Sequence, residues 1–274
     1  MLLPHRHLGK SGPVLLLIHG YMVDGGMFMA VEEGFVGHYR LLIPDLRGYG
    51  DAWNWPGPYT FDQRVEDLSV LVRHYTNEPV WLLGYSMGGA LAQLFARRYP
   101  QLTAGIILGC TFAHKPLTPL ERMQQALIPR LLRLLPPASL ANLIYTQVFG
   151  SETFTPEVLA WYRKALQKTR LEVLLTDHEE IFRFDSRPWL SELRFPTLVI
   201  GGTSDLIVPS YHSEMLARGI PGAELLLYKG AGHALIFTHR RLFVRDMHRF
   251  ILRMRQKSAT ASSLPDPPPP PVRG

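Results

Sequence analysis

Residues 79–96 read Pro-Val-Trp-Leu-Leu-Gly-Tyr-Ser-Met-Gly-Gly-Ala-Leu-Ala-Gln-Leu-Phe-Ala, and this stretch decides the predicted fold. The apolar run before Gly84 predicts a buried strand, and the residues from Ala90 onward favour a helix. Ser86 therefore lies between glycines at a sharp turn from strand to helix, the context that a nucleophile elbow requires. Such a turn exposes a hydroxyl at the carboxyl edge of a sheet. We predict that Ser86 is a nucleophile, and a tight glycine turn without chemistry is the alternative interpretation.

A nucleophilic serine needs a base, and the base needs a third group that fixes its tautomer. The predicted strand at residues 196–200 leads into a loop that carries Asp205. The next predicted strand, at residues 224–228, leads into a loop of small residues that carries His233. Small neighbours leave the histidine free to reach across the sheet edge to Ser86. The chain order Ser, Asp, His is that of the α/β-hydrolase fold.

From about Gly12 to about Arg253 the sequence resembles the α/β-hydrolase superfamily, in particular its small capped esterases, lactonases and carbon–carbon bond hydrolases. His19-Gly20-Tyr21-Met22 follows an apolar run and looks like the oxyanion loop of that family. The resemblance implies that the backbone amides of Tyr21 and Met87 hold the oxyanion, and such donors contribute about 3 kcal/mol each. Dehalogenases and epoxide hydrolases of this fold carry aspartate at the elbow. The serine found here favours acyl transfer instead.

The resemblance also implies an α/β fold with a mostly parallel, doubly wound sheet of about six or seven strands and a helical cap inserted after the sixth strand. Most members place two short strands before the one that leads to the oxyanion loop, and residues 2–12 leave room for at most one of them. We predict a core at residues 1–112 and 194–256, a helical cap at 113–193 and a disordered proline-rich tail at 257–274. Helical patterns of the cap fall at residues 119–135, 138–149, 156–169 and 171–184.

The remaining histidines and acids are interpreted as structural or solvated groups. We assign three histidines to helix surfaces: His212, His239 and His248. The rivals of Asp205 as catalytic acid are interpreted as solvated charges: Asp177, Glu179, Glu180 and Asp185. His19 is expected to hold its loop by hydrogen bonds, and Asp45 and Arg47 are expected to form an ion pair or a cap.

Composition argues against several other classes of protein. The 274 residues are 46% hydrophobic, which suits one α/β core with a modest insert. The one cysteine, Cys110, excludes an internal disulfide and is predicted to be a buried thiol at a strand end. The net charge of +6 is scattered, which argues against a nucleic-acid partner. Without a signal-type leader or a run of roughly 18 apolar residues, we expect no membrane span and a cytoplasmic location.

The predicted function is hydrolysis of a carboxylic ester with a small to medium acyl chain, without a metal or an organic cofactor. The partner is a small-molecule ester, and apolar cap residues such as Tyr145 and Trp161 are expected to line its pocket. The same triad would serve a lactonase or a carbon–carbon bond hydrolase. The alternative outside the enzymes is a ligand-binding protein that has this fold and converts a substrate slowly or not at all.

Overall fold

Short apolar runs form the strands of a single sheet. The structure, a computed structural model, describes residues 2–116, 118–135, 139 and 155–262. Seven strands of this part of the chain form one sheet in the order β1-β3-β2-β4-β5-β6-β7. β1 is antiparallel to β3, and the other neighbouring pairs are parallel. The predicted mostly parallel α/β sheet is confirmed. The strand bounds are β1 (His5–Leu8), β2 (Val14–Ile18), β3 (Arg40–Pro44), β4 (Val80–Tyr85), β5 (Thr103–Gly109), β6 (Thr197–Gly202) and β7 (Glu224–Tyr228).

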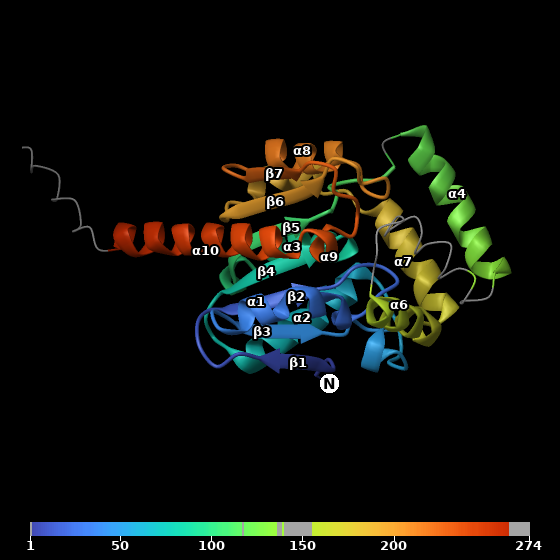
Figure 1. The fold of residues 1–274 in the computed structure, drawn as a ribbon, viewed down its shortest axis with the longest axis horizontal. Coiled ribbons are helices and arrows are strands. Elements are labelled where there is room, and N and C mark those ends of the chain that lie inside the picture. Colours follow the sequence, from blue (N-terminus) through green and yellow to red (C-terminus); the bar gives the residue numbers. More distant parts are fainter. Residues whose placement is uncertain (1, 117, 136–138, 140–154, 263–274) are drawn as a thin grey trace, which may run out of the picture.

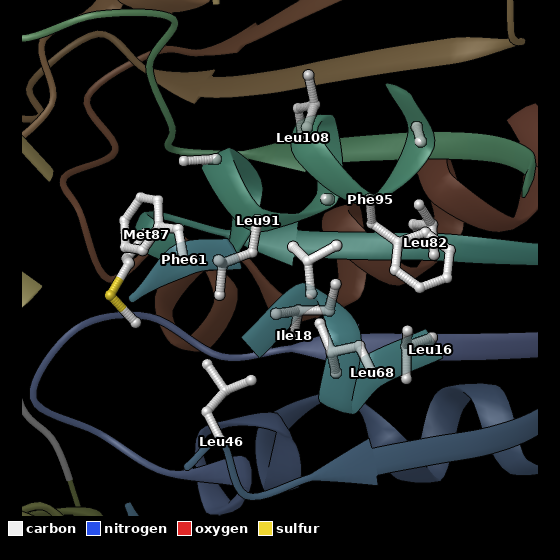
Figure 2. Close-up of a cluster of buried hydrophobic side chains, with 14 of the residues drawn as sticks. Leu16, Ile18, Leu46, Phe61, Leu68, Leu82, Met87, Leu91, Phe95 and Leu108 are labelled. Atoms are coloured by element: carbon white, nitrogen blue, oxygen red, sulfur yellow. The ribbon is translucent and has the colours of Figure 1, made fainter. Parts of the chain in front are cut away.

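Helices cover both faces of the sheet because its central strands are apolar on both sides. Figure 2 shows Leu16, Leu82 and Leu108 in one core with side chains of α2 (Phe61–Tyr75) and α3 (Met87–Arg98). Leu216 of α8 (Ser210–Gly219) belongs to the same core. Leu15 and Leu83, next to Leu16 and Leu82 in the chain, belong to a second core with side chains of α1, α9 and α10. The helix bounds are α1 (Glu32–Val36), α2 (Phe61–Tyr75), α3 (Met87–Arg98), α8 (Ser210–Gly219), α9 (Leu235–Thr238) and α10 (Arg240–Ser262). Short 3-10 helices are η1 (Gly25–Ala30), η2 (Gly50–Ala52) and η3 (Pro100–Leu102).

The segment between β5 and β6, which we call the insert, is helical in its described part. It contains α4 (Pro119–Leu134), α6 (Pro156–Lys168), α7 (Leu171–Arg183) and the short η4 (Arg187–Glu192). Figure 1 shows α4, α6 and α7 grouped beyond the ends toward which the parallel strands point. Three helices of the predicted cap thus form where their patterns fall. The predicted helix at residues 138–149 lies, apart from residue 139, outside the described residues.

The insert follows β5, the fifth strand along this chain, and not a sixth. Within residues 2–13, β1 is the one strand that forms ahead of β2, as the short segment before the oxyanion loop predicted. The expected count of six came from the resemblance, which implies two short strands at that place. The missing strand shortens one edge of the sheet and leaves the strands beside Ser86 in place.

The last described helix is longer than predicted. α10 continues to Ser262, past residue 256 where the core was expected to end (Figure 1). Gln256, Lys257 and Ser258 are exposed, and the hydroxyl of Thr260 donates to the carbonyl of Gln256 one turn earlier at 2.6 Å. Helix-forming residues such as lysine, glutamine and alanine allow that extension. The rest of the predicted tail, residues 263–274, lies outside the described residues. No helix in the described ranges combines the length and the apolar character that crossing a membrane requires.

Candidate active site

Ser86 occupies the turn between β4 and α3, with φ of 54° and ψ of −122°. This left-handed φ is uncommon for a residue with a side chain, and the neighbouring glycines make the turn sterically possible. A Cβ at Gly88 would overlap the backbone of β2, and a Cβ at Gly84 would overlap the backbone of Gly88. Thr111 also holds the turn, because its hydroxyl donates to the Ser86 carbonyl at 2.6 Å. The strand, turn and helix expected around Ser86 are all present.

The structure brings the three predicted triad residues together. His233 Nε2 lies 3.1 Å from Ser86 Oγ, and His233 Nδ1 lies 2.8 Å from Asp205 Oδ2. A carboxylate can only accept, so Nδ1 carries the proton and Nε2 accepts from the Ser86 hydroxyl. This tautomer is the one that a general base requires. Asp205 is 3% exposed and His233 is 8% exposed, so water competes little for these hydrogen bonds.

Asp205 and His233 are themselves held by neighbouring groups. The other oxygen of Asp205 accepts the backbone N–H groups of Ile207 and Val208, at 2.9 and 2.8 Å. The hydroxyl of Tyr85 donates to the carbonyl of His233 at 2.6 Å. Tyr85 immediately precedes Ser86, so the end of β4 positions both the predicted nucleophile and the loop that carries His233. The sequence contains no signal for this role, because any residue is allowed between the glycine and the serine of the motif.

The predicted oxyanion donors lie on the two segments that flank Ser86. Met87 is the first residue of α3, where the backbone N–H groups have no partner within the helix. The oxyanion loop passes close to the serine, since a Cβ placed on Gly20 would lie 3.3 Å from Ser86 Cβ. Among the turn and loop hydrogen bonds of the described residues, none is donated by the N–H of Tyr21 or of Met87. Their role in binding an oxyanion stays a prediction.

The side chain of His19 forms hydrogen bonds at the start of the oxyanion loop. Its Nε2 accepts the N–H of Leu46 at 3.0 Å, and its Nδ1 lies 2.9 Å from the Gly20 carbonyl. The ring therefore carries its proton on Nδ1 and donates it to Gly20. The side chain is fully buried, and burial lowers the pKa of His19 to about 4. These contacts agree with the structural role expected from the sequence.

We expect the neutral state of His19 to make stability fall in acid. An unfolded histidine titrates near pH 6.5, so between about 6.5 and 4 the unfolded chain binds a proton that the folded protein excludes. This group alone would remove about 3 kcal/mol of stability by pH 4. Urea unfolding should therefore show a smaller loss between pH 7 and pH 4 in His19→Gln than in the wild type. An equal loss in the two proteins would contradict the assignment.

Asp177 is not the solvated charge that its sequence context suggested. It is completely buried, and it forms an ion pair with Arg64 of α2 and accepts the hydroxyl of Tyr49 at 2.5 Å. Glu180 is also largely buried and accepts the N–H of Phe61 at 2.8 Å. Both acids attach α7 to the core. Glu179 is exposed as expected, and Asp185 pairs with Arg187 at 2.6 Å and is partly exposed.

His212 is likewise buried, although it was assigned to a helix surface. Its Nε2 lies 2.6 Å from Glu121 Oε1, in the first turn of α4. The ammonium of Lys115 lies 3.7 Å from the same carboxylate and donates to the carbonyl of Ile207 at 2.9 Å. Burial lowers the pKa of both His212 and Lys115. This cluster joins the insert to the loop of Asp205. His239 and His248 are partly buried near helix surfaces.

Asp45 and Arg47 do not pair with each other. Asp45 accepts the backbone N–H groups of Gly25 and Asp51, at 2.9 and 2.8 Å, so the cap interpretation holds for it. Arg47 instead forms an ion pair with Asp67 of α2 at 2.7 Å. Both residues follow β3, but Asp45 binds backbone N–H groups and Arg47 binds the side chain of Asp67.

Cys110 is the buried thiol at a strand end that the sequence predicts. It follows β5 with φ of 44°, and burial raises the pKa of its thiol well above the ordinary value. Its sulfur lies within 4.8 Å of ligand atoms of Asp205 and His233, the one such group of metal-type ligands in the described part of the chain. Asp205 and His233 already form a hydrogen bond with each other, and His233 forms a second one with Ser86, as the predicted triad requires. The set therefore suits a triad better than a metal centre.

Comparison with known proteins agrees with this geometry. A model of the alpha/beta hydrolase fold family matches residues 13–240, so the protein belongs to the α/β-hydrolase family. A pimeloyl-[acyl-carrier protein] methyl ester esterase of Chromobacterium violaceum is 27% identical, over 86% of this chain and 93% of that protein. Relatives of this kind support a hydrolase.

Two solved structures are similar to this protein along most of its length. A thermophilic esterase from Thermogutta terrifontis has a TM-score of 0.79 at 29% identity, and covers 92% of this chain and 93% of its own. The enol-lactonase from Burkholderia xenovorans LB400 has a TM-score of 0.79 at 25% identity, and covers 91% and 96%. Both hydrolyse ester-type bonds according to their names.

Proposed function

We propose that this protein is a serine hydrolase that cleaves carboxylic esters with small to medium acyl chains through an acyl-enzyme. The observation that carries the proposal is the continuous hydrogen-bond chain from Asp205 through His233 to Ser86. It ends on a hydroxyl at a strained turn above a helix amino terminus, where a developing oxyanion is stabilised. The esterases among the relatives support the same chemistry.

The proposed reaction has two halves. Ser86 Oγ attacks the ester carbonyl carbon while His233 Nε2 takes the hydroxyl proton, and the amides of Tyr21 and Met87 bind the oxyanion. The tetrahedral intermediate collapses as His233 gives that proton to the departing alcohol. Water then attacks the acyl-enzyme, with His233 as base again, and releases the acid and Ser86. Asp205 keeps its hydrogen bond to His233 Nδ1 in both halves and stabilises the imidazolium form of His233.

Hydrolysis of p-nitrophenyl esters from acetate to laurate tests the proposal. We expect turnover that saturates with substrate and a kcat/KM that is highest among the shorter chains, because each added methylene must find apolar space in the acyl pocket. Burst kinetics would indicate the acyl-enzyme. Folded protein that hydrolyses none of these esters would end the esterase proposal. A protein that binds them tightly without turnover would instead be a ligand-binding member of the fold.

A second candidate is hydrolysis of a lactone, which is a cyclic ester. The likeness to an enol-lactonase structure at 25% identity supports it. Both reactions use the same groups, and they differ in whether the leaving alcohol stays attached to the acyl chain. Parallel measurement of kcat/KM for simple lactones and for the linear esters distinguishes them. A lactone preference of tenfold or more, which corresponds to about 1.4 kcal/mol, would replace the ester proposal.

A further inference from the structure

The oxyanion loop is held by the insert as well as by the core. The hydroxyl of Tyr21 donates to the carbonyl of Leu174, in α7, at 2.7 Å. Three residues further on, Asp24 Oδ1 accepts the indole N–H of Trp161, in α6, at 2.7 Å. The same carboxylate oxygen caps η1 through the N–H of Gly26 at 2.8 Å. Two helices of the insert, α6 and α7, therefore contact the oxyanion loop at its predicted donor residue, Tyr21, and at Asp24.

The loop needs such support because its backbone is strained. Met22, the residue after Tyr21, has φ of 64° and is a buried side-chain-bearing residue in the left-handed region. Conformations of this kind persist only where the surroundings hold them in place. Contacts on both sides of Met22, from Tyr21 and from Asp24, meet that requirement. Loss of either contact would remove one of the two supports that flank this strained residue.

Helix α7 is in turn fixed to the core beside the same loop. Asp177, one turn after Leu174, is buried against Arg64 and Tyr49. The ring of Tyr49 packs edge to face on His19, with centroids 5.2 Å apart. His19 then holds Gly20. The oxyanion loop therefore contacts both α7 and His19. These two supports are linked by the hydrogen bond from Tyr49 to Asp177 and by the packing of the Tyr49 ring on His19.

We propose that α7 is part of the framework of the oxyanion hole and that the Tyr21 hydroxyl is a positioning group that orients the backbone N–H of its own residue. This inference rests on the proposed serine-hydrolase function. The Tyr21 hydroxyl forms its hydrogen bond with α7 and not with Ser86 or His233. Its loss should therefore weaken stabilisation of the transition state more than binding of the substrate. An amide that is turned away from the oxyanion position stabilises the charge less, although the ground-state ester still fits.

The test compares Tyr21→Phe with Tyr59→Phe as a matched control. Tyr59 is buried, and its hydroxyl, like that of Tyr21, donates to a backbone carbonyl, that of Trp55 at 2.8 Å, which lies outside residues 19–26. We expect Tyr21→Phe to lower kcat about tenfold with KM within twofold of wild type, and Tyr59→Phe to leave kcat within twofold. Affinity for a trifluoromethyl ketone analogue of the preferred ester should fall in parallel with kcat/KM.

Amide hydrogen exchange gives a readout that is independent of turnover. Peptides that cover residues 19–26 should exchange faster in Tyr21→Phe than in wild type or in Tyr59→Phe. If wild type is active and the two variants have the same kcat, the same analogue affinity and the same exchange, the inference is wrong and the proposed function stands. If the wild type hydrolyses no ester or lactone and binds no analogue, the proposed function fails and the inference fails with it. A change in KM alone would also overturn the positioning role.

Discussion

Ser86→Ala should lower kcat for p-nitrophenyl esters by at least about 10³-fold, and combining it with His233→Ala should cost little more. The reason is that Ser86 and His233 act as one unit, since the base has no proton to take once the hydroxyl is gone. Asp205→Asn should lower kcat by about 10⁴-fold, because an amide cannot hold the tautomer with a proton on Nδ1. Initial rates with the preferred ester measure both effects.

The fold should survive the Ser86 substitution. Alanine removes a single oxygen, and the backbone contacts of the turn are made by main-chain groups and Thr111. A matched control is Ser69→Ala, which removes a mostly buried hydroxyl of α2 that bonds the Glu66 carbonyl, and it should keep wild-type kcat. Labelling with a fluorophosphonate, located by mass spectrometry, should mark Ser86 in the wild type. An active and unlabelled Ser86→Ala protein would mean that the nucleophile lies elsewhere or that the chemistry is different.

Asp177→Ala is expected to lower the free energy of unfolding by about 3–5 kcal/mol. The substitution leaves the guanidinium of Arg64 fully buried without its counter-charge and removes the acceptor of the Tyr49 hydroxyl. Equilibrium unfolding in urea measures the loss. Glu214→Ala is the control, because it breaks an exposed ion pair with Arg218 and should cost less than about 1 kcal/mol.

A double variant separates the buried charge from the lost packing. Arg64→Met with Asp177→Leu removes both charges and keeps apolar volume, so it should recover much of the stability that Asp177→Ala loses. A cost for Asp177→Ala no larger than that of Glu214→Ala would contradict the inferred role of the pair. It would also weaken the argument that α7 is a fixed support of the oxyanion loop.

The sequence alone was sufficient to place the predicted triad at one edge of one sheet. Strand-forming apolar runs precede Ser86, Asp205 and His233, and carboxyl ends of parallel strands meet at the same edge. The glycines at the elbow can likewise be predicted from sequence, because the tight turn leaves no room for a Cβ at Gly84 or Gly88. These features depend on local geometry and on strand direction, both of which a linear pattern encodes.

Only the tertiary structure decided which polar residues of the helices face inward. Asp177 and His212 lie in segments with helical periodicity, and nothing in such a pattern tells a solvated charge from a buried one. Their partners Arg64 and Glu121 are distant in the chain, and the hydrogen bond from Tyr21 to Leu174 likewise joins two segments that meet only through packing. A buried charge is tolerated only when a specific partner meets it. Local sequence therefore determined which residues meet at the candidate site, and long-range packing determined which side chains contact the predicted oxyanion loop.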